Sequence, residues 1–193
     1  MCRGPQSFGV DLVQSRYLAC FLDVLLAAGL LLSLETQLRP GASEVGPGEL
    51  CLVLWAIPFI ISLLLRNDLI VPRACWEVLQ FWAVFALALS LGAIMSIVLG
   101  EILDVSLVAH DIVAYLLLIL ITVLMTLSLP SSRMARIEWL FVTFGAVSVL
   151  LQAANTWGWY ALPNIDPWYW ERVRGWCENP NQLALLCILL ALV

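Results

Sequence analysis

Long apolar segments separated by short polar stretches dominate this chain. A helix that crosses the hydrocarbon core of a bilayer needs about 20 largely apolar residues. Five segments meet this requirement: Tyr17–Leu34, Glu49–Leu65, Trp76–Gly100, Val105–Leu129 and Ile137–Thr156. A further apolar run begins near Gln182 and reaches Val193, which is about half of a span. The pattern predicts an all-α fold, a polytopic transmembrane helix bundle with five full spans and the start of a sixth.

This pattern divides the chain into three expected parts. Residues 1–156 hold the N-terminal transmembrane helices, residues 157–181 form a loop rich in Trp and Arg, and residues 182–193 begin the sixth span. Because that last run covers only half of a bilayer, we expect the chain to be the N-terminal part of a larger protein. The first apolar segment lacks a small-residue cleavage site after it, so we expect a retained helix rather than a signal peptide.

The positions of the arginines predict the orientation of the helices. Three segments that would share one side of the membrane carry two arginines each: Arg3 and Arg16, Arg66 and Arg73, Arg133 and Arg136. The positive-inside rule then places the N-terminus in the cytoplasm and residues 157–181 outside, which in a bacterium is the periplasm. Arg172 and Arg174 lie in that outer loop, against the charge bias. We therefore expect them to serve a purpose other than topology.

Composition supports a membrane protein and narrows the possible chemistry. The chain is 63% hydrophobic and 12% charged, whereas soluble domains are nearer half apolar and a quarter charged. So little polar surface indicates lipid as the solvent. A net charge of -5 argues against binding to nucleic acid. The six cysteines show no metal-ligand spacing, and most lie in or beside apolar segments. We expect no disulfide framework, no metal and no cofactor.

Aromatic residues crowd the loop between the fifth and sixth apolar segments. Five tryptophans lie there: Trp157, Trp159, Trp168, Trp170 and Trp176. Tryptophan favours the lipid–water interface, but its ring also stacks on sugars, and the two interpretations are compatible. Within "NIDPWYWERVRG", Asp166 suits a helix N-cap and Pro167 suits the first helical position. We therefore expect a short interfacial helix here.

The segment "ENPNQLAL" carries strong signals for the start of a helix. Asn179 suits the N-cap, Pro180 the first helical position and Gln182 the third position of a capping box. Free N–H groups at such a helix end attract anions, phosphate above all. Arg172 and Arg174 could fold back over this end, because a guanidinium fits phosphate oxygens. The alternative is a well-capped helix with arginines that snorkel to the interface.

Several further polar residues lie within or beside the apolar segments. Asp23 is costly inside a membrane unless it pairs with an arginine or faces a cavity. His110, beside Asp111, is the single histidine and could be a general base or a hydrogen-bonded residue of the bundle. Gln152 and Asn155 close the fifth segment, where they could line a glycan cavity or form hydrogen bonds between helices.

The stretch "RVRGWCENPNQLA" resembles the signature of the O-antigen ligase and polymerase superfamily, which reads Arg-x-x-Gly, then Asn-Pro-Asn, then Leu-Ala. These are polytopic enzymes that assemble bacterial surface polysaccharides. In that family the signature follows several N-terminal helices, as it does here. The match covers only this short stretch, and hydropathy and topology supply the rest of the resemblance.

The resemblance implies a glycosyltransferase of the bacterial inner membrane. The donor would be a glycan on undecaprenyl diphosphate, and the acceptor a hydroxyl of lipid A core or of another glycan. Arg172 and Gly175 match the Arg-x-x-Gly positions. The implied diphosphate-binding residues are Arg172, Arg174, Asn179 and Asn181, with structural roles for Gly175 and Pro180. The catalytic base would lie in a later loop beyond Val193, so this chain alone should be inactive.

Two other interpretations remain open. A fragment of a multi-pass transporter or permease would show a helix broken at mid-membrane and paired repeats, and the nearly uninterrupted apolar segments disfavour it. An anchor or assembly subunit without chemistry would not cluster polar groups at one end, as the stretch from Arg172 to Gln182 does.

Overall fold

Six α-helices and one small hairpin make up the part of the chain that the structure describes. The computed structural model describes residues 16–38, 45–65, 71–99 and 105–192. The helices are α2 (Arg16–Leu34), α3 (Pro47–Leu64), α4 (Arg73–Val98), α5 (Val105–Ser128), α6 (Ser131–Thr156) and α7 (Pro180–Leu192). Each coincides with an apolar segment of the sequence to within a few residues. The all-α prediction is confirmed apart from the hairpin.

Four of these helices are long and apolar enough to cross a membrane: Arg16–Leu34, Pro47–Leu64, Ser131–Thr156 and, within α4, Arg73–Gly92. The multi-pass membrane class is therefore supported. Five full spans are not confirmed, because α5 counts only as a shorter apolar helix over Tyr115–Ser128. The side chains of His110 and Asp111 lie outside the described residues, so the structure does not test their proposed roles.

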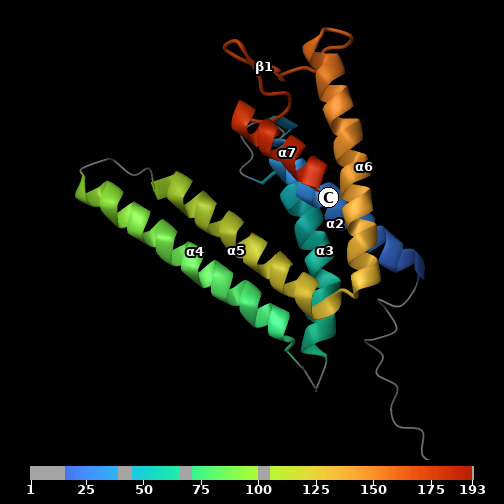
Figure 1. The fold of residues 1–193 in the computed structure, drawn as a ribbon, viewed down its shortest axis with the longest axis vertical. Coiled ribbons are helices and arrows are strands. Elements are labelled where there is room, and N and C mark those ends of the chain that lie inside the picture. The colour runs from blue at the N-terminus through green and yellow to red at the C-terminus, as the bar shows by residue number, and fades with distance from the viewer. Residues whose placement is uncertain (1–15, 39–44, 66–70, 100–104, 193) are drawn as a thin grey trace, which may run out of the picture. The chain divides into compact units, whose positions relative to one another are not determined.

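The chain forms two compact units, residues 1–58 with 130–193 and residues 59–129. In the first unit α6 packs along α2, and α7 contacts both helices (Figure 1). Buried leucines on α2, such as Leu22 and Leu26, form the centre of this packing, and Leu186 adds to it from α7. Gly145 of α6 lies against the side chain of Leu190 of α7, which a Cβ at this position would displace. Small residues of this kind let membrane helices approach closely.

A buried ion-pair cluster joins α2 to the start of α6 in the first unit. The Asp23 carboxylate is fully buried, and its Oδ1 accepts hydrogen bonds from Arg133. Its Oδ2 lies 2.6 Å from Nη2 of Arg136. Of the two expectations for Asp23, pairing with arginine is confirmed. Pairing offsets the large desolvation cost of an isolated carboxylate in such a place.

The second unit consists mainly of α4 and α5, which lie side by side and antiparallel (Figure 1). One hydrogen bond connects them, from Trp82 Nε1 to Thr122 Oγ1 at 2.9 Å. Phe85 stands edge-on to Trp82 and to Tyr115, which extends the contact. Most of the other large apolar side chains of α4 are exposed, which suits contact with lipid.

The prediction of a short helix over "NIDPWYWERVRG" is wrong, because the segment forms a β-hairpin. Strand β1 (Trp168–Tyr169) pairs antiparallel with β2 (Arg172–Val173) in the register Trp168–Val173 and Tyr169–Arg172. Asp166 does act as a cap, but its Oδ1 accepts the N–H of Trp168 within a turn. The same Asp-Pro signal begins turns and helices, and the aromatic and β-branched residues that follow favour strands.

Candidate functional site

The loop between α6 and α7, residues 157–179, is tied to the segment that follows α2 by Gln37. This residue lies in the 3-10 helix η1 (Thr36–Leu38), just after α2. Its Nε2 donates hydrogen bonds to the carbonyl oxygens of Gly175 (3.1 Å) and Cys177 (2.5 Å). Its Oε1 accepts the N–H of Asp166 at 3.1 Å, and its own N–H donates to the Trp176 carbonyl at 3.0 Å. One residue thereby holds both sides of the base of the hairpin.

A buried carboxyl group lies beside this anchor. Glu35 follows α2 directly and is only 2% exposed. Its Oε1 accepts hydrogen bonds from the Ser148 hydroxyl and from Gln152 Nε2, the latter at 3.1 Å. Burial raises the pKa of Glu35 above its ordinary value of 4.5, by more than these two hydrogen bonds lower it. Through these two hydrogen bonds Glu35 joins the end of α2 to α6.

The two polar residues at the end of α6 turn toward the loop. Gln152 Oε1 accepts the backbone N–H of Trp176 at 3.0 Å. Asn155 Oδ1 accepts Nε1–H of the same Trp176 at 3.3 Å, and Asn155 Nδ2 donates to the Tyr160 carbonyl at 3.0 Å. Both side chains are buried. Both residues form hydrogen bonds, as one of the two expectations has it, but these bonds run to the loop and to Glu35 rather than from helix to helix.

The glycine of the Arg-x-x-Gly motif is required by this packing. Gly175 has a φ of +60°, in the left-handed region that L side chains rarely adopt. A Cβ atom at this position would also overlap Oε1 of Gln152. The motif glycine therefore brings the loop backbone against α6, which fits the structural role assigned to it from the sequence.

Arg174 stabilises the hairpin rather than presenting a free cation. Its Nε donates to the Asp166 carbonyl (2.9 Å), its Nη1 to the Glu178 carbonyl (3.3 Å) and its Nη2 to the Asp166 carboxylate (3.2 Å). Its guanidinium also lies over the ring of Tyr169, 5.7 Å from the centroid. These contacts use at least three of the five N–H donors that arginine offers.

The start of α7 is capped much as its sequence predicts. Asn179 Oδ1 accepts the N–H groups of Asn181 (3.0 Å) and Gln182 (3.1 Å), and Pro180 is the first helical residue. Gln182 Oε1 accepts the N–H of Glu178 (2.9 Å), one residue before the position that a capping box uses. These N–H groups are thus occupied rather than free. An anion at this helix end would feel mainly the helix dipole.

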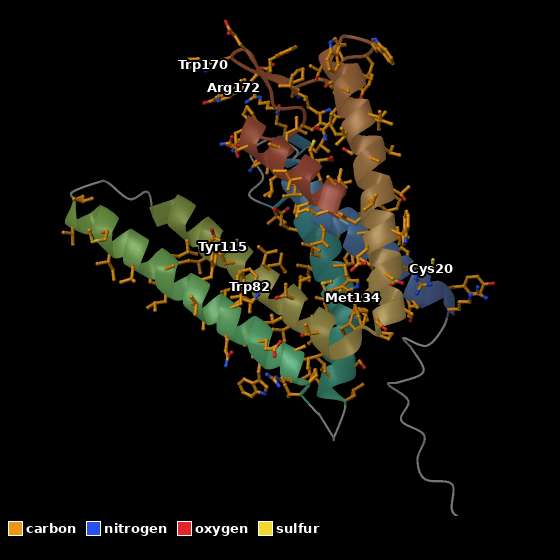
Figure 2. The ribbon with its side chains drawn as sticks, viewed as in Figure 1. Cys20, Trp82, Tyr115, Met134, Trp170 and Arg172 are labelled. Carbon is orange, nitrogen blue, oxygen red and sulfur yellow. The ribbon has the colours of Figure 1, made fainter. Side chains whose placement is uncertain are left out.

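Arg172 differs from Arg174 in its exposure and in its contacts. Its side chain is exposed, and no hydrogen bond or ion pair holds it within the residues that the structure describes. Figure 2 shows Trp170 and Arg172 on the hairpin, beyond the end at which α7 begins. The predicted site residues are therefore gathered at one end of the first unit. Arg172 is the arginine whose donors remain available, while Arg174 and Asn179 position the backbone around it.

No family model matches the chain, and searches of curated proteins and of solved structures found no match. The resemblance to O-antigen ligases and polymerases therefore depends on the motif residues between Arg172 and Ala184 and on the helical layout.

Proposed function

We propose that this chain is the N-terminal membrane part of a glycosyltransferase resembling O-antigen ligases and polymerases. It would act in the bacterial inner membrane, on a glycan carried by undecaprenyl diphosphate, with a hydroxyl of lipid A core or of another glycan as acceptor. Arg172 would contact the diphosphate. The observation that carries the proposal is the exposed Arg172 side chain, which has no ion pair among the residues that the structure describes, on a hairpin whose other arginine is held by Asp166 and Glu178.

Physical reasons support this assignment. The backbone around Arg172 is held by Gln37, by Arg174 and by the contact between Gly175 and Gln152. A guanidinium that projects from such a frame starts from a fixed backbone position and can offer its planar fork to phosphate oxygens. Neutralising charge on a departing diphosphate lowers the barrier to glycosyl transfer. The base that activates the acceptor belongs to the chain beyond Val193 in this proposal.

The test replaces Arg172 with alanine in the complete protein, purified into lipid nanodiscs. We expect glycan transfer to be abolished and the affinity for undecaprenyl diphosphate to fall by about tenfold or more, because a hydrogen bond to a charged group contributes about 1.5–3 kcal/mol. Membrane insertion should be unchanged. Arg73→Ala is the matched control, since Arg73 is an exposed arginine that pairs with Glu77 on α4. Normal transfer and normal carrier affinity in the Arg172→Ala protein would refute the proposal.

No specific observation favours the alternative of a transporter fragment. That class places substrate at a helix broken near the middle of the membrane. The long helices of the described residues are continuous, and α3 runs unbroken from Pro47 to Leu64 although Pro58 lies inside it. The polar groups of the first unit instead gather around the hairpin loop and around Asp23 near the start of α6.

A further inference from the structure

The tip of the hairpin holds a tryptophan in a backbone conformation that tryptophan disfavours. Trp170 has a φ of +58° and its side chain is 90% exposed. A left-handed conformation costs an L residue about 1–2 kcal/mol, and glycine would avoid that cost. Trp170 and Glu171 form the two-residue turn between β1 and β2, and such a turn requires a positive φ at its first residue. The turn therefore accounts for the backbone conformation, but it favours glycine, and no hydrophobic core explains a large exposed aromatic side chain here. A tryptophan kept at such a position points to a binding role.

One aromatic neighbour lies beside the Trp170 ring. The ring of Tyr169 is nearly parallel to it, with the centroids 6.4 Å apart and the planes inclined by 22°. Arg174 in turn lies over the ring of Tyr169, and Asp166 fixes Arg174. The exposed indole is therefore the outer member of a row of planar side chains, and its open face can stack on a ligand.

The register of the hairpin places a cation beside this stack. Tyr169 and Arg172 are directly opposed across the two strands, so their side chains leave the same face of the hairpin. The exposed guanidinium and the aromatic stack thus lie within reach of one small ligand. Phosphate suits the guanidinium, and the C–H face of a pyranose ring suits an indole. Together they match the chemistry of a sugar joined to phosphate.

We infer that the hairpin tip binds the sugar residue next to the diphosphate of a lipid-linked glycan, with that sugar stacked on Trp170 and the phosphate on Arg172. This inference deepens the proposed function and rests on it. Insertion of Trp170 into the lipid interface is the competing occupant. The Arg172 guanidinium on the same face of the hairpin favours the sugar phosphate, and the experiment below distinguishes the two occupants.

The experiment compares two carriers that differ only in the sugar, using the complete protein in nanodiscs. The probes are undecaprenyl diphosphate and undecaprenyl diphosphate bearing N-acetylglucosamine, and the readout is the dissociation constant of each. We expect the wild-type protein to prefer the glycosylated carrier by about two- to tenfold, the range of an aromatic stacking contact. Trp170→Leu should abolish this preference without changing the affinity for the bare carrier.

Two further variants keep the test independent of folding. Trp170→Gly relieves the left-handed strain, so it should fold at least as stably as the wild type and still lose the preference for the sugar. Trp159→Leu is the matched control, because Trp159 is an exposed tryptophan of the same loop away from the hairpin tip. It should keep the preference. Equal affinity of the wild type for both carriers, or a preference that survives in both Trp170 variants, would overturn the inference.

The outcomes separate this inference from the proposed function. If Arg172→Ala weakens binding of both carriers and Trp170→Leu changes neither, the diphosphate site stands and the sugar site fails. If Arg172→Ala changes neither carrier, the proposed function itself fails. Nanodiscs made with brominated phosphatidylcholine supply the third arm. If this lipid quenches tryptophan fluorescence in the wild type and the quenching is absent from Trp170→Gly, the indole lies in lipid. That result would overturn the sugar site.

Discussion

Gly175→Ala tests whether the contact between the hairpin loop and α6 sets the stability of the site. The substitution places a Cβ on a residue with a φ of +60° and against Gln152 Oε1. The left-handed conformation costs about 1–2 kcal/mol for alanine. Moving the Gln152 oxygen also leaves the buried N–H of Trp176 without its acceptor, which costs about 1–3 kcal/mol. We expect local opening of the loop to become easier by about 2–5 kcal/mol.

Cys177 provides the assay for this opening. Its side chain is fully buried, and burial, followed by the nearby Glu35 and Cys187, raises the pKa of its thiol to about 12. The thiol is therefore unreactive while the loop is closed, because alkylation requires the thiolate. Labelling by N-ethylmaleimide, followed residue by residue with peptide mass mapping, should be at least about 30-fold faster in Gly175→Ala, as about 2 kcal/mol implies.

A second glycine separates the two contributions. Gly158 also has a positive φ, +77°, but a Cβ there would meet open space. Gly158→Ala therefore carries the backbone strain without the overlap, and it should speed the labelling of Cys177 by about 5- to 30-fold, less than Gly175→Ala does. Equal acceleration in the two variants would show that the contact with Gln152 has no energetic effect. No acceleration in either would refute the reasoning about the closed loop as a whole.

Two further substitutions probe the buried charges of the first unit. Asp23→Asn leaves two arginines without their counter-ion and should lower the free energy of unfolding by about 3–5 kcal/mol, measured as a lower melting temperature in detergent. The control Glu77→Gln removes an exposed ion pair and should cost at most about 1 kcal/mol. Equal losses in the two variants would contradict the assignment of Asp23 as a buried ion-pair partner. Because burial raises the pKa of Glu35 in the folded state, its stabilising effect is full below about pH 4.5 and is lost as the pH rises through the folded value. Labelling of Cys177, normalised to that of a small free thiol in the same sample, should therefore accelerate with pH in the wild type and stay constant in Glu35→Gln. A flat wild-type profile would contradict this.

The helices and the cap of α7 were predictable because their signals are local. Apolar runs of about 20 residues define spans by themselves, and the Asn-Pro-x-Gln pattern at Asn179 specifies its own hydrogen bonds within a few residues. The hairpin was missed because Asp166 and Pro167 begin turns as readily as helices. The aromatic residues after them favour strands, but they also suit an interfacial helix, and the pairing of β1 with β2 decides between the two.

The anchor of the site could not be predicted because it joins distant parts of the chain. Gln37 and Gly175 are separated by 138 positions, and nothing near Gln37 in the sequence marks it as a binding partner. Glu35 follows an apolar segment, where an exposed carboxylate is the ordinary expectation. Its burial depends on Ser148 and Gln152 of α6, which the packing of α6 along α2 brings to it.

The anchoring also explains how the hairpin can hold a strained residue at its tip. The four hydrogen bonds of Gln37 to the loop contribute about 1 kcal/mol each, which exceeds the cost of about 1–2 kcal/mol for Trp170 in the left-handed region. If Gln37 were lost, the hairpin would relax before the helices unfolded, because the bonds concerned lie outside α2, α6 and α7. The positive φ of Trp170 and the long-range contacts of Gln37 are therefore parts of one arrangement, in which the half-buried Gln37 amide fixes the backbone of the hairpin and leaves the side chains of Trp170 and Arg172 exposed.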